Sequence, residues 1–270
     1  MRRLSIFLLT CLFLFAFDVQ AVKKKTKSSK RQETRDAIHK LKSPNPEEVM
    51  YAVQILAASG SKEAVGPLTD LLRSGPRNDV TNGIIQALGS ISNKASIELL
   101  IEYLGHRRPD ARVAAIYALE NYKDTRVTKA LEDAMRDSDS QVRSTAALSL
   151  GKRGNTNSVP ILFMAFDRGV HDAAISIGQL GKPEHAKHLA DYLGKADVKV
   201  LLPGFDEFLR RSDFPKKAKL EILNQLFELA GPDVRRFAIA YKASFPPGTD
   251  EDENELYKKV CRMVRQIQEE

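Results

Sequence analysis

Apolar and polar positions repeat along the chain with a period of about thirty residues. Five segments align when they begin at Glu48, Val80, Ala111, Val142 and Gly169, which gives steps of 32, 31, 31 and 27 residues. Offsets +4, +5 and +8 from each start are apolar and follow one face of an α-helix. They hold Ala52, Ile84, Ala115, Ala146 and Ala173; then Val53, Ile85, Ile116, Ala147 and Ala174; then Leu56, Leu88, Leu119, Leu150 and Ile177.

A second helix is predicted in every segment. Offset +12, mostly residues that suit a helix end, holds Gly60, Ser92, Lys123, Gly154 and Gly181. Offset +13 holds Ser61, Asn93, Asp124, Asn155 and Lys182, and the first four are good N-caps. Apolar residues follow at +20 (Leu68, Leu100, Leu131, Leu162, Leu189) and +24 (Leu72, Leu104, Met135, Phe166, Leu193). Since one hairpin cannot cover both of its apolar stripes, consecutive hairpins must stack into an all-α solenoid.

The most regular segments resemble a known family. Asp110-Ala111-Arg112 and Asp139-Ser140-Gln141-Val142-Arg143, each followed by alanines and a leucine, are similar to HEAT repeats of the short, lyase-like bacterial class. The resemblance implies a binding surface, with Arg112 and Arg143 paired to aspartates of adjacent repeats such as Asp110 and Asp139. The alternative is that the two arginines grip the carboxylate of a ligand.

The ends of the repeat array depart from the pattern. We expect an N-terminal capping helix at 32–42, regular repeats at 44–195, degenerate repeats at 196–244 and a C-terminal capping helix at 250–270. Pro203-Gly204 is expected to interrupt the first helix of the degenerate part, because proline removes a helical hydrogen bond. Residues 196–231 are therefore predicted to open more readily than 111–166.

The N-terminus reads as a targeting segment. Arg2 and Arg3 precede an apolar run at 4–17, and Val19 and Ala21 are small residues placed as at a signal-peptidase site. We expect a secretory signal at 1–21 and a periplasmic or secreted protein. Two alternatives remain: lipidation of Cys11, or retention of the run as an uncleaved membrane anchor.

Charge is concentrated behind this segment. The chain carries a formal net charge of +7. Residues 1–21 contribute +1 of it, and a basic segment at 22–31 contributes +6, which leaves residues 32–270 neutral. We expect 22–31 to be a disordered arm, either a solvated linker or a peripheral contact with an anionic membrane surface. A neutral body without Trp argues against a nucleic-acid partner.

No catalytic motif is present. The sequence contains no Gly-rich phosphate loop, no Gly-x-Ser-x-Gly and no His-Glu-x-x-His, and no cofactor is expected. His185, His188 and Asp191 share one predicted helix and are a weak zinc candidate, although residues six apart diverge around a helix. Cys261 lies on the apolar side of the last predicted helix, as a buried thiol would.

One column of the second helices points to a partner. Offset +22, opposite the apolar stripe, holds Asp70, Glu102, Asp133, Met164 and Asp191. We call it the acidic column and expect it on the concave surface of the solenoid, where it would recognise a basic segment. The alternative is that exposed helical positions simply favour charge. The sequence thus favours a non-catalytic scaffold for a protein or peptide, with a degenerate lyase or metal-dependent enzyme as the alternative.

Overall fold

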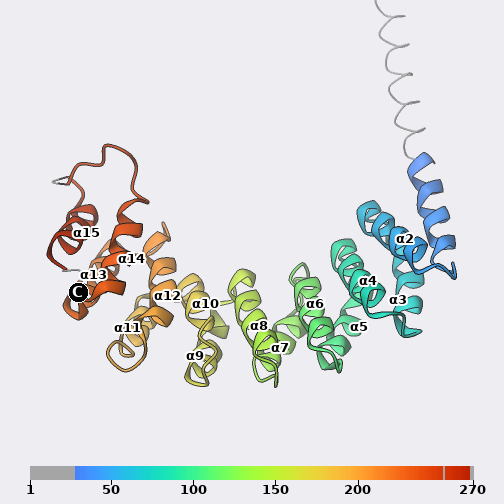
Figure 1. The fold of residues 1–270 in the computed structure, drawn as a ribbon, viewed down its shortest axis with the longest axis horizontal. Coiled ribbons are helices and arrows are strands. Elements are labelled where there is room, and N and C mark those ends of the chain that lie inside the picture. The colour runs from blue at the N-terminus through green and yellow to red at the C-terminus, as the bar shows by residue number, and fades with distance from the viewer. Residues whose placement is uncertain (1–27, 252, 268–270) are drawn as a thin grey trace, which may run out of the picture. The chain divides into compact units, whose positions relative to one another are not determined.

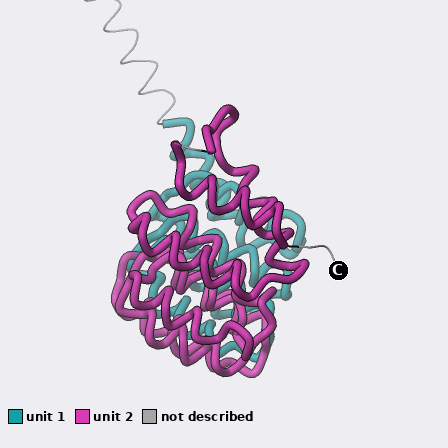
Figure 2. The backbone as a smooth tube through the Cα atoms, turned by 90° about the vertical axis from the view of Figure 1, so that its left-hand side faces the viewer, with its two compact units in different colours: residues 1–122 teal, residues 123–270 magenta. Residues whose placement is uncertain are grey.

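The fold is an all-α solenoid built from antiparallel helical hairpins (Figure 1). The computed structural model describes residues 28–251 and 253–267, and the expected signal segment lies outside this part. The chain divides into two compact units, residues 1–122 and 123–270, and each is described by itself (Figure 2). The described residues form no β-strand, and none of their helices is long and apolar enough to cross a membrane.

The first unit begins with a helix at residues 28–40. It continues with α2 (Pro46–Ser59), α3 (Val65–Arg73), α4 (Asn78–Ile91), α5 (Ile97–Glu102) and α6 (Pro109–Leu119). The second unit contains α7 (Thr125–Ala134), α8 (Ser140–Arg153), α9 (Val159–Asp167), α10 (Ala173–Leu180), α11 (Pro183–Ala190), α12 (Val198–Arg210), α13 (Lys216–Leu229), α14 (Pro232–Lys242) and α15 (Glu255–Gln266).

The predicted apolar columns form the core. All fifteen residues at offsets +4, +5 and +8 are buried, as are the five leucines at +20. At +24, Leu104 and Leu193 are half-buried and the other three are buried. The repeat period therefore identifies which face of each helix packs, and burial of these faces is the main stabilising contribution.

The predicted N-caps are also confirmed. The side chains of Ser61, Asn93, Asp124 and Asn155 each accept a hydrogen bond from the backbone N–H two residues later. At Lys182, the one position of the column without a capping side chain, the backbone N–H instead donates to Nδ1 of His185 at 2.9 Å. Gly60 and Gly154 end their helices with positive φ, as helix-ending glycines commonly do.

Small residues bring the first helices of neighbouring hairpins very close together. Offset +9 is glycine in three hairpins: Gly89, Gly151 and Gly178. A Cβ atom on Gly89 would lie 2.6 Å from Cα of Ala118, and one on Gly151 would lie 2.5 Å from Oγ of Ser176. Only glycine lets the backbones approach this closely. The hydroxyl of Ser176 also donates to the Ala147 carbonyl at 2.8 Å across the same junction.

The first helices form the more closely packed row of each unit. Within each unit, α2–α4–α6 and α8–α10–α12 pack more extensively than the second helices α3–α5 and α9–α11–α13 do. A groove of about 430 Å³ lies between α11 and α13. The second helices, and the acidic column on them, therefore form the more loosely packed row of each unit.

Outside the regular repeats, three features of the structure differ from the expectations from the sequence. Residues 28–31 belong to the first described helix and are therefore helical rather than part of a disordered arm. Pro203 lies inside α12 without breaking it, because the flanking residues Leu201 and Phe205 are fully buried and hold the helix in place. The last helix begins at Glu255, five residues late, because the side chain of Asn254 caps it.

Candidate functional site

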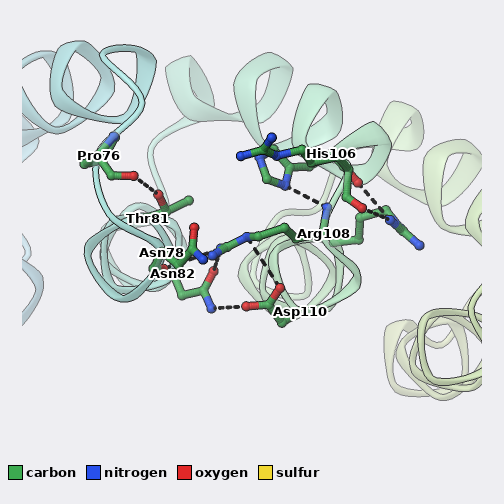
Figure 3. Close-up of polar contacts among 9 residues, drawn as sticks. Pro76, Asn78, Thr81, Asn82, His106, Arg108 and Asp110 are labelled. Carbon is green, nitrogen blue, oxygen red and sulfur yellow. Dashed lines mark hydrogen bonds and ion pairs between the residues drawn. The ribbon is translucent and has the colours of Figure 1, made fainter.

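A polar cluster joins the starts of α4 and α6 in the first unit (Figure 3). Arg108 donates through Nη2 to Oδ1 of Asn82 at 2.9 Å, and Asn82 donates through Nδ2 to Oδ2 of Asp110 at 2.9 Å. The hydrogen bond from Asn82, with a smaller contribution from Arg108, lowers the pKa of Asp110. Nε of Arg108 also lies 3.5 Å from Oδ1 of Asp110, so an ion pair supports the two hydrogen bonds that fasten the two helices together.

The same region holds a stacked pair of rings. His106 stacks on Tyr103 with 5.3 Å between ring centroids, and its Nδ1 accepts the backbone N–H of Arg108 at 3.2 Å. Burial, followed by the nearby Arg108 charge, lowers the pKa of His106. Nδ1 therefore remains an acceptor at neutral pH, which favours a structural role for this histidine.

In three of the five hairpins the residue at offset +1 fastens the loop that precedes the first helix. Arg112 donates to the carbonyls of His106 at 2.8 Å and Arg107 at 3.3 Å, and Arg143 donates to those of Asp137 at 2.9 Å and Ser138 at 3.0 Å. In the preceding hairpin Thr81 donates to the Pro76 carbonyl at 3.1 Å (Figure 3).

The residues of the expected arginine–aspartate ladder contact loop backbone and helix starts. Arg143 bonds carbonyls of its own loop, while Asp139 caps the start of α8 and Asp110 accepts from Asn82. Arg112 makes the equivalent pair of carbonyl bonds and is buried. Both guanidinium groups therefore hold the backbone of the loop before their helix.

The acidic column is exposed but uneven. Asp70 and Glu102, in the first unit, make no ion pair within the described residues. In the second unit Asp133 pairs with Lys129 at 3.0 Å, so part of its charge is compensated. Met164 is 46% exposed, and Asp191 lines the groove between α11 and α13.

The candidate zinc ligands do not converge. His185 uses Nδ1 to accept the Lys182 N–H, and His188 stacks on Phe163 with 4.1 Å between ring centroids. Among the described residues no group of three His, Cys, Asp or Glu side chains could hold a metal ion. Cys261 is buried, as its place on the apolar side of its helix indicated. The metal-dependent alternative therefore gains no support from the geometry.

An aromatic cluster lies beside the candidate zinc ligands on α11. Tyr192 packs edge-on against Phe166, and its hydroxyl donates to Oδ1 of Asp167 at 2.5 Å. This bond to a carboxylate, more than desolvation, raises the pKa of Tyr192 to about 12. Together with the stack of His188 on Phe163, the bond fixes α9 against α11 and its following turn.

A different surface emerges on the first helices of the first unit. Tyr51 on α2 is 58% exposed and Tyr117 on α6 is 51% exposed, and both lie opposite the buried stripe of their helices. Gln54 and Gln86 are exposed on the same side of α2 and α4. We call Tyr51, Gln54, Gln86 and Tyr117 the tyrosine–amide face.

The signal for this face was present in the repeat. Offsets +2, +3, +6 and +10 carry no charged residue in the first three hairpins, although 29% of the whole chain is charged. Beside Tyr51 a groove of about 410 Å³ runs between α2 and the start of α4. Its lining includes Met50, Gln54 and the ion pair of Arg77 with Asp79, whose side chains lie 3.0 Å apart.

Comparisons with solved structures find other helical-repeat proteins. One is the complex of CpcE and CpcF of phycocyanin lyase from Nostoc sp. PCC7120, with 18% identity, coverage of 87% of this chain and 94% of that chain, and a TM-score of 0.47. Another is a designed armadillo repeat protein in complex with the peptide (KR)4, with 14% identity, coverage of 85% and 98%, and a TM-score of 0.39. Among curated proteins no match is found.

The family comparison covers the regular part of the array. The model for HEAT repeats matches residues 34–110 and 97–174, which together make up more than half of the chain. These ranges contain the first four hairpins, with their buried columns and all four side-chain N-caps. The protein therefore belongs to the HEAT-repeat family.

Proposed function

We propose that this HEAT-repeat protein is a non-catalytic scaffold that binds a protein or peptide partner, and that the tyrosine–amide face makes the contact. The observation that carries the proposal is the pair of exposed tyrosines, Tyr51 and Tyr117, on first helices of one unit. Exposed tyrosines suit an interaction site, because aromatic residues are enriched at protein interfaces.

The chemistry of the face suits a polypeptide. Tyrosine buries a large area at a low cost in side-chain entropy and is enriched among the residues that dominate binding energy. Each glutamine side chain offers both a donor and an acceptor, which matches a peptide group. Because the four residues are uncharged, the partner can cover them without desolvating an ion.

The fold holds this face rigidly. Gly89 brings α4 against Ala118 of α6, and the Tyr122 hydroxyl donates to the Leu88 carbonyl at 2.8 Å across the same junction. A surface whose helices cannot shift loses little freedom when the partner binds.

The place of action is part of the proposal. The signal-like segment at 1–21 supports export to the periplasm or beyond, with cleavage after Ala21. Sequencing the N-terminus of the protein isolated from its native source tests this. A chain that begins at Val22 is expected, and an intact Met1 in a cell-associated fraction would contradict cleavage.

Site-specific photo-cross-linking in the native cell tests the scaffold. A photoreactive amino acid replaces Tyr51 or Tyr117 on the face, and in matched controls it replaces Asp70 or Glu102 on the second helices of the same unit. We expect discrete adducts with a protein from positions 51 and 117 and none from 70 and 102.

The other outcomes separate the rival surfaces. Adducts from positions 70 and 102 alone would transfer binding to the acidic column and would contradict the tyrosine–amide face. If none of the four positions yields an adduct while the variants remain folded and abundant, the first unit binds no protein and the proposal fails.

A further inference from the structure

The N-terminal end of the first unit contains a groove that the scaffold function does not use. It has a volume of about 360 Å³ and lies between the helix at 28–40 and α2. Ile55, Ala58 and Thr34 contribute apolar surface to it. Exposed Lys30 and Arg31 also line it, together with Glu33.

The two cations at this groove lack a carboxylate partner in the part of the chain that the structure describes. Within the described residues neither Lys30 nor Arg31 forms an ion pair, although arginines elsewhere in the chain do, such as Arg77 with Asp79. A cation without a fixed counter-charge beside an apolar hollow suits a ligand that is anionic at one end and apolar at the other.

The net positive charge of the chain is concentrated in the sequence around the groove. Residues 23–42 hold nine Lys or Arg and two acidic residues, a net +7, which leaves residues 43–270 at −1. Each basic residue near an anionic membrane adds about 1 kcal/mol of attraction. A charge cluster at one end of a nearly neutral body orients that end toward the membrane.

We propose that this end of the protein docks on an anionic lipid membrane, with lipid phosphates at Lys30 and Arg31 and the apolar part of a lipid in the groove beside Ala58. The groove lining shares no residue with Tyr51, Gln54, Gln86 and Tyr117 of the tyrosine–amide face. Docking would place the scaffold at a membrane surface without a spanning helix, since basic residues and apolar contact together give stable peripheral binding.

Vesicle co-sedimentation tests the electrostatic half. The protein is purified from an exporting host, its N-terminus is read by mass spectrometry, and it is mixed with phosphatidylcholine vesicles with or without phosphatidylglycerol. We expect binding only when phosphatidylglycerol is present, and weaker binding at high salt. The double variant Lys30→Glu/Arg31→Glu should bind at least roughly 30-fold more weakly.

The matched control reverses two exposed lysines elsewhere, Lys94→Glu/Lys123→Glu, and changes the net charge equally. It should keep most of the binding. Equal losses in the two double variants would reduce the effect to net charge and overturn the site, as would equal binding of the wild type to both kinds of vesicle.

A tryptophan reporter tests the apolar half. The chain has no Trp, so Ala58→Trp introduces a single probe at an exposed groove position, and Gln86→Trp is its control on α4. With phosphatidylglycerol vesicles the emission at position 58 should shift to the blue and be quenched by lipids brominated on their acyl chains. No shift at position 58, or equal shifts at 58 and 86, would overturn insertion of a lipid into the groove.

Discussion

Gly178 of α10 lies directly against Gly204 of α12. A Cβ atom on Gly178 would be 2.2 Å from the carbonyl oxygen of Gly204, and one on Gly204 would be 2.5 Å from the carbonyl oxygen of Ala174. The two helices cross at backbone contact, so Gly204 forms part of a close junction between hairpins rather than a break in the repeat.

The first prediction concerns this crossing. Gly178→Ala should lower the free energy of unfolding of the second unit by roughly 1–3 kcal/mol, because the added methyl group forces backbone apart. Gly66→Ala is the control, since a Cβ there meets nothing within 4 Å and alanine favours a helix. Urea denaturation measures both. A Gly178→Ala variant as stable as the wild type would contradict the close crossing.

Hydrogen exchange should show that α12 is not a weak point. The sequence pattern predicted easy opening of residues 196–231, on the premise that Pro203-Gly204 interrupts a helix. Because α12 is continuous and buries Phe205 and Phe208 completely, amides of 205–210 should be protected as strongly as those of 113–119. Much faster exchange in 205–210 would contradict this and support the prediction that residues 196–231 open readily.

Loss of an N-cap should destabilise a single hairpin turn. Asn93→Ala removes the acceptor for the Ala95 N–H, a bond of 3.0 Å, and should cost about 1 kcal/mol. Lys182→Ala, in the same repeat column, removes no cap and should change stability by much less. Thermal melts of the two variants provide the comparison, and equal effects would show that the capping bond contributes nothing.

Alkaline pH should weaken the contact between α9 and the turn after α11. The pKa of Tyr192 is raised from 10.0 to about 12 in the folded protein, so its contribution is complete below pH 10 and is lost as the pH rises through 12. Tyr192→Phe should therefore melt with a shallower pH dependence between 10 and 12 than the wild type. Identical slopes would show that Tyr192 ionises normally.

Most of the fold could be predicted from the repeat columns. Leu68, Leu100 and Leu131 recur at one offset because each covers the same gap between hairpins, and four of the five residues at offset +13 accept the capping bond. Periodicity is a local property of each hairpin, so one chain is sufficient to reveal it.

The position of the candidate site could not be derived in the same way. Which helical row lies inside depends on the spacing between hairpins, and this is set by contacts such as Gly89 with Ala118 that span two repeats. The repeat pattern therefore does not identify the side on which the acidic column lies. The exposed Tyr51 and Tyr117 form no column in the sequence, because they occupy different offsets.

The salt dependence of partner binding tests the tyrosine–amide face most directly. With the partner identified by cross-linking, its dissociation constant is measured at low and high salt for the wild type, Tyr51→Ala/Tyr117→Ala and Glu102→Lys/Asp133→Lys. We expect little effect of salt, weakening of roughly 10-fold or more in the tyrosine variant, and no change in the charge-reversed one. Binding that falls steeply with salt and is lost only on charge reversal would contradict the face and assign the partner to the acidic column.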